Sequence, residues 1–68
     1  MNPETSIGEL IRNRRKDENL KLTELAEKVD VTMITAYRWE HGIARPNKTN
    51  IPALAKVLHV SPAQLRKH

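Results

Sequence analysis

The sequence predicts an all-α fold, a compact bundle of four to five short helices that forms one domain over residues 1–68. Three observations favour this class. Apolar residues recur at the three- and four-residue spacing of amphipathic helices. Alternation of apolar and polar residues is confined to 20–22 and 29–31, which are too short for strands. Residues that commonly cap helices precede the apolar runs, and a chain of 68 residues makes one domain at most.

The first helix is expected to begin at a capping box formed by Ser6 and Glu9. In this motif each side chain accepts a hydrogen bond from the other residue's backbone N–H. Ile7, Leu10 and Ile11 supply the buried stripe of the helix. The run 12–16 is too polar for a core-facing segment, apart from one arginine, and 17–19 end the helix.

The second helix is expected over about 23–29, and the third over about 33–41. Between them, Asp30 tolerates a left-handed backbone and Thr32 is a favourable N-cap. Gly42 supplies the stop after the third helix. The apolar side of the second helix consists of Leu22, Leu25, Ala26 and Val29.

After a connector at 43–49, Asn50 is expected to cap a fourth helix. Pro52 is tolerated there because it lies in the first turn. Ser61 followed by Pro62 predicts the start of a short fifth helix that closes the chain through Leu65. The buried stripe of the fourth helix is Ile51, Leu54, Ala55 and Leu58, with Val57 at its edge.

The third helix has two different faces. With Ala36 at the centre of the inner face, Met33, Trp39 and Glu40 fall within about 60° of it. Ala36 is small, as is Ala26, so the second and third helices can cross closely as a helix-turn-helix unit. A small basic domain that presents such a helix usually lays it in the major groove of DNA.

Glu40 places a carboxylate on the inner face, where an unpaired charge is costly. Arg14 lies four residues after Leu10, and Arg15 lies four residues after Ile11. Both therefore follow the buried stripe of the first helix, and periodicity does not choose between them.

Composition favours some classes of function and argues against others. The net charge of +4 and a pI near 9.9 favour a polyanionic partner. The chain has no cysteine, and its histidines at 41, 59 and 68 are scattered, so we expect no disulfide, structural metal or cofactor. No apolar run approaches the ~20 residues that span a bilayer, and a cytoplasmic location is expected. No credible nucleophile or metal set supports an enzyme.

From Ile7 to Leu65 the sequence resembles the helix-turn-helix family of phage repressors, Cro proteins and Xre-type transcriptional regulators. The resemblance implies sequence-specific binding of a double-stranded DNA operator by a bacterial or phage-encoded regulator. The expected regulator is a nucleoid-associated repressor that forms a homodimer at least on DNA. The matching segments are 7–9 with Ile11, 25–29, 31–32, 39–42, 45–46, 54–58 and 60–61.

The resemblance also implies roles for individual residues. Arg15 pairs with Glu40, and Arg14 becomes a surface residue. The positions expected to read bases are Thr32, Met33, Ile34, Thr35, Tyr37 and Arg38. The positions expected to bind phosphate are Lys21, Leu22 and Thr23 at the start of the second helix, and His41, Arg45, Asn47 and Lys48 after the third.

This chain departs from the family pattern in three places. Lys21-Leu22 stands where a Ser or Thr followed by Gln is common, so a side-chain contact is lost and Lys21 can substitute as a point charge. Asp30 replaces a frequent glycine in the turn. Ile34 replaces a commonly polar reader, so part of the readout is expected to be apolar contact with thymine methyl groups.

Several alternatives stay open. Tyr37 either packs its ring on the fourth helix or donates its hydroxyl to a phosphate. The apolar Met33 and Ile34 also suit a protein-interaction module of the same fold, such as an antitoxin component or an adaptor. The ending at 64–68 favours neither a complete regulator nor the amino-terminal part of a longer repressor, so a further C-terminal domain or a protein antagonist is possible. The segment after the fourth helix and the terminal helix are the expected dimer contact.

Overall fold

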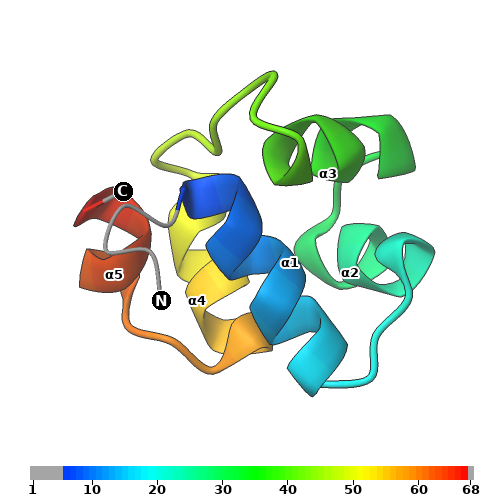
Figure 1. Ribbon diagram of the computed structural model, residues 1–68, viewed down its shortest axis with the longest axis horizontal. Coiled ribbons are helices and arrows are strands. Elements are labelled where there is room, and N and C mark those ends of the chain that lie inside the picture. The colour runs from blue at the N-terminus through cyan, green and yellow to red at the C-terminus, as the bar shows by residue number, and fades with distance from the viewer. Residues whose placement is uncertain (1–5, 68) are drawn as a thin grey trace.

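The computed structural model describes residues 6–67, which form five α-helices and no strand (Figure 1). The all-α prediction is therefore confirmed, while His68 lies outside the described residues. The helices are α1 (Ile7–Asp17), α2 (Leu22–Val29), α3 (Met33–Glu40), α4 (Asn50–Leu58) and α5 (Pro62–Lys67). α2 begins one residue earlier than expected, and α3 ends one residue earlier.

Local hydrogen bonds explain where α1 and α3 begin. The capping box of α1 is present, because Ser6 Oγ accepts from Glu9 N at 3.1 Å and Glu9 Oε1 accepts from Ser6 N at 3.3 Å. The turn between α2 and α3 closes at Asp30, whose φ of 63° is left-handed. Thr32 then caps α3 by accepting a hydrogen bond from Thr35 N at 3.2 Å. These features agree with the sequence prediction.

The expected cap of α4 is wrong. Asn50 is the first residue of α4, and Thr49 before it makes no capping side-chain hydrogen bond. Asn47 supplies the side-chain contact instead, because its Oδ1 accepts from Asn50 N at 3.0 Å. A capping side chain serves an N–H two or three residues further along the chain, and the turn at 47–49 brings Asn47 to that distance. At the start of α5, Ser61 Oγ accepts from Gln64 N at 3.3 Å, as the Ser-Pro pair predicted.

A single apolar core joins the helices. α4 packs against α1, α2 and α5, while α3 packs against α1 and α2 (Figure 1). Trp39 is the largest fully buried side chain, and it brings the end of α3 into the core. The buried apolar residues are Ile7, Ile11, Leu25, Ala26, Val29, Ala36, Trp39, Ile51, Leu54, Ala55, Leu58 and Leu65.

Arg14 is not the surface residue that the family resemblance implied. Its side chain is 30% exposed, and its Nε donates to the carbonyl oxygen of Leu58 at 3.1 Å. The last carbonyls of a helix lack partners within the helix, so this arginine satisfies the end of α4. It also pairs with Asp17 and Glu18 at 3.2 and 3.3 Å. Arg14 therefore ties α1 to α4.

Candidate nucleic-acid interface

The inner face of α3 is held from behind by α1 and α2. Ala36 and Trp39 are buried. The Glu40 side chain is 4% exposed, and its carboxylate receives two hydrogen bonds from Arg15, Nε to Oε2 at 2.6 Å and Nη2 to Oε1 at 3.1 Å. Arg15 Nη1 also donates to the carbonyl oxygen of Leu20 at 2.8 Å. Of the two arginines that periodicity allowed, the structure pairs Arg15 with Glu40.

This ion pair has its polar atoms satisfied. Among the described residues, no buried side-chain nitrogen or oxygen lacks a hydrogen-bond partner. A bidentate arginine–carboxylate pair is geometrically specific as well as strong. The pair therefore fixes the last turn of α3 relative to α1.

The outer face of α3 is open to solvent. Ile34 is 57% exposed and Tyr37 is 47% exposed, and Arg38 is exposed beside them. Thr32 is also exposed, whereas Thr35 is half-buried, and its backbone and side chain both form hydrogen bonds with Thr32. Four of the expected base-reading positions thus lie together on one accessible surface.

Helical projection and the family resemblance give Met33 different places, near the inner face and among the base-reading positions respectively. The helical projection put it near the inner face, yet it is 48% exposed. A helical side chain points back toward the N-terminus and covers the preceding turn. Met33 is the first residue of α3 and has no preceding turn of that helix to cover, which leaves its side chain exposed. This position joins Met33 to the outer face.

Tyr37 and His41 make a contact that the sequence interpretation missed. Their ring centroids lie 4.0 Å apart with the planes tilted by 30°. Residues four apart are neighbours on a helix surface, so the spacing could have indicated the pair. The contact places an aromatic and an imidazole side by side at the end of the exposed face.

The expected phosphate-binding residues flank α3 on two sides. Lys21 and Thr23 are exposed at the start of α2, and Leu22 between them is half-buried against the core. Residues 41–49 connect α3 to α4, and α3 lies between this connector and α2 (Figure 1). In the connector, His41, Arg45, Asn47 and Lys48 are all exposed.

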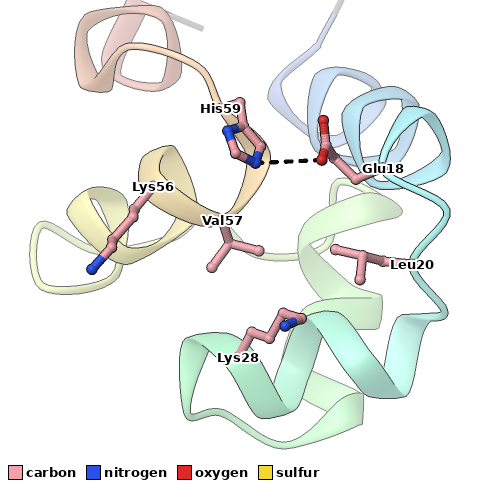
Figure 2. Close-up of a pocket in the computed structure, with 6 residues that line it drawn as sticks. All are labelled: Glu18, Leu20, Lys28, Lys56, Val57 and His59. Carbon is pink, nitrogen blue, oxygen red and sulfur yellow. Dashed lines mark ion pairs between the residues drawn. The ribbon is translucent and has the colours of Figure 1, made fainter.

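A pocket of about 490 Å³ lies elsewhere, and it shares no residue with the outer face of α3. Figure 2 shows that its walls come from the ends of α1 and α4 and from α2. His59 Nε2 lies 3.4 Å from Glu18 Oε1 across its rim. The lining residues are Glu18, Leu20, Lys28, Lys56, Val57 and His59. This set holds no Ser, Thr or Cys nucleophile.

Within residues 6–67, no three His, Cys, Asp or Glu side chains gather in a way that could hold a metal ion. No helix in that part of the chain has the length and apolar character needed to cross a membrane. The candidate site is the exposed outer face of α3 with its basic flanks.

The family model described as Helix-turn-helix matches residues 11–65. The chain is 44% identical over 59 residues to the HTH-type transcriptional regulator DicA of Escherichia coli strain K12, which covers 84% of this chain. It is 38% identical over 61 residues to Repressor protein C2 of Salmonella phage P22, which covers 90% of this chain.

Two solved structures share the fold. The P22 c2 repressor in complex with the synthetic operator 9T superposes with a TM-score of 0.83 and 37% identity, covering 87% of this chain and 89% of that one. SinR, the master regulator for biofilm formation, in complex with DNA superposes with a TM-score of 0.81 and 31% identity, covering 90% of this chain and 98% of that one. The chain spans 42% of the length of DicA and 28% of that of C2.

Proposed function

Since the chain belongs to the helix-turn-helix family of phage repressors and Xre-type regulators, we propose that it binds double-stranded DNA sequence-specifically within a transcriptional regulator. One observation carries the proposal. The inner face of α3 is held by Trp39 and the Arg15–Glu40 pair, while Ile34 and Arg38 on its outer face are exposed. A rigid helix with one open face and basic flanks fits the major groove.

In this proposal the outer face of α3 reads the bases. Arg38 carries two parallel donors that suit guanine O6 and N7. Ile34 and Met33 are apolar and suit the methyl group of thymine. Thr32 and Thr35 offer hydroxyls near the start of the helix, and Tyr37 lies at the side of the same surface.

The flanks of α3 contact the phosphate backbone. The first turn of α2 offers backbone N–H groups and the positive end of the helix dipole at Leu22 and Thr23, with the ammonium of Lys21 beside them. The connector offers Arg45 and Lys48 as cations and His41 and Asn47 as hydrogen-bond donors. These contacts set position and affinity but carry no sequence information.

The relatives support the same class of function. The P22 c2 repressor and SinR were both solved on DNA, and each matches most of this chain. We expect repression as the mode of regulation and a cytoplasmic location at the nucleoid, with no enzymatic activity. We also expect a homodimer that sets two recognition helices about 34 Å apart on the operator, with α5 and the segment before it as the contact.

Titration against random duplex DNA at several salt concentrations tests the proposal first. Because phosphate contacts release counterions, the logarithm of the affinity should fall linearly with the logarithm of salt concentration. Selection of bound duplexes from a random pool, followed by a footprint, should then yield a defined half-site with two-fold symmetry. Binding that recovers no preferred sequence would contradict sequence-specific recognition.

A protein-interaction module is the second candidate, because Met33 and Ile34 are 48% and 57% exposed on the presented helix. An antitoxin component or an adaptor of this fold would use these apolar side chains against another protein. Apolar contacts depend little on salt. No DNA binding at low salt, together with salt-independent capture of a protein partner, would favour this candidate.

A further inference from the structure

Gly8 lies in the first turn of α1 and is buried against the last turn of α3. A Cβ atom built on Gly8 would lie 2.6 Å from the carbonyl oxygen of Trp39 and 2.7 Å from that of Glu40. It would also lie 3.0 Å from the carbonyl carbon of Glu40. All three neighbours are backbone atoms, so no rotamer change or side-chain truncation on α3 could make room. The sequence placed Gly8 between the two capping-box residues and in a segment that resembles the family, but it did not predict this contact.

The close approach is electrostatically favourable as well as tight. Gly8 lies at the start of α1, where the helix dipole is positive, and the carbonyls of Trp39 and Glu40 lie at the negative end of α3. Opposite helix ends attract each other. A residue without a side chain therefore lets these two ends meet at their shortest separation.

Gly8 and Arg15 act on the same segment of α3. They are seven residues apart, or about two helical turns, and so lie on one face of α1, with the buried Ile11 between them. The carbonyl of Glu40 lies against Gly8, while its carboxylate is bound by Arg15. α1 thus holds Glu40 at two points. Arg38, a base-reading candidate, is only two residues before this anchor.

We infer that Gly8 is a positioning residue for DNA reading by α3, an inference that rests on the proposed function. A methyl group at Gly8 must move the two backbones apart by about 1 Å to restore an ordinary contact distance of ~3.5 Å. Since α3 is a short rigid helix, a displaced last turn carries Arg38 and Ile34 with it. Contacts to base edges depend on such distances, whereas phosphate contacts from flexible lysines tolerate the shift.

The thermal midpoint of unfolding provides the first test. Alanine forms helices better than glycine, so G8A should raise the Tm if no atom of α3 lies close to Gly8. We expect G8A to lower the Tm instead. The matched control N13A introduces alanine at an exposed position of the same helix, and it should leave the Tm unchanged or raise it.

The ratio of affinities for the selected duplex and a random duplex provides the second test. Measurements are made on fully folded protein, with trimethylamine N-oxide added where a variant needs it, because this osmolyte favours compact states. For G8A the ratio should fall about tenfold, comparable to the loss of one good base contact. G8A should retain its affinity for the random duplex. N13A should match the unsubstituted protein both in this affinity and in the affinity ratio.

Three outcomes would overturn the inference. A Tm for G8A at or above that of the unsubstituted protein would show that the two helix ends are not in close contact. A folded G8A with an unchanged affinity ratio would make Gly8 merely structural. A G8A chain that stays unfolded in the osmolyte would assign Gly8 to folding rather than positioning. If the unsubstituted protein binds no duplex, the proposed function fails, while the Tm comparison still reports on the contact itself.

Discussion

The two faces of α3 have opposite surroundings although they belong to the same eight residues. Ala36, Trp39 and the Glu40 side chain are almost completely buried, whereas Ile34 and Tyr37 expose about half of their surface. An isolated helix this short is unstable in water, so its conformation depends on the inner face. Different residues of one helix therefore provide stability and recognition. Substitutions on the inner face should change stability, and substitutions on the outer face should change DNA binding.

The largest expected effect is on the inner face, at Arg15. R15A would leave the Glu40 carboxylate buried without its partner, which should lower the free energy of unfolding by about 3–5 kcal/mol. Urea denaturation measures this loss. R12A, which removes an exposed arginine from the same helix, should change the free energy of unfolding by less than about 0.5 kcal/mol. Similar values for the two variants would contradict the role of the ion pair.

On the outer face, R38A should weaken binding to the selected duplex by about 1–3 kcal/mol and relax the preference at one base pair. Its thermal stability should remain unchanged, because Arg38 is exposed. Quantitative binding to a panel of single-base-pair variants of the half-site measures both values. Intact affinity and intact base preference would show that α3 is not the recognition helix.

Thr32 lies at the boundary between the two faces and should show both effects. Its hydroxyl caps α3, so T32A should lower the free energy of unfolding by about 1 kcal/mol and also weaken DNA binding. T32S keeps a capping hydroxyl and should retain the stability. A T32A variant as stable as T32S would mean that the observed hydrogen bond to Thr35 N adds nothing to the stability of α3.

The smallest effect is expected beside α3, in the connector. K48A should weaken binding to all duplexes alike and reduce the salt slope by about one unit. K56A removes an exposed lysine at the pocket on α4 and should leave the slope unchanged. Equal slopes for the two variants would remove Lys48 from the phosphate-binding set.

Much of the architecture could be predicted from local sequence. The cap at Ser6, the turn at Asp30 and the cap at Thr32 all depend on hydrogen bonds between residues three or four apart, and the structure contains each of them. Ala36 could be placed at the centre of the inner face because helical periodicity is equally local. Interactions between residues so close in the chain can be recognised from the sequence alone.

The contacts between helices did not follow from periodicity, and the Arg15–Glu40 pair was expected only because of the family resemblance. Periodicity left Arg14 and Arg15 equivalent; in the fold Arg15 meets Glu40, and Arg14 instead meets the end of α4 at Leu58. The path of the connector likewise brings the side chain of Asn47 to the backbone N–H of Asn50 at the start of α4.

By itself, the sequence determined which segments are helical and which side of each helix is apolar, because backbone hydrogen bonding and periodicity extend over a single turn. Only the tertiary structure decided that Gly8 touches the backbone of α3 and that Arg14 meets the end of α4. Such distances depend on the crossing angle and separation of whole helices. These are set jointly by the packing of the core, and no local pattern encodes them.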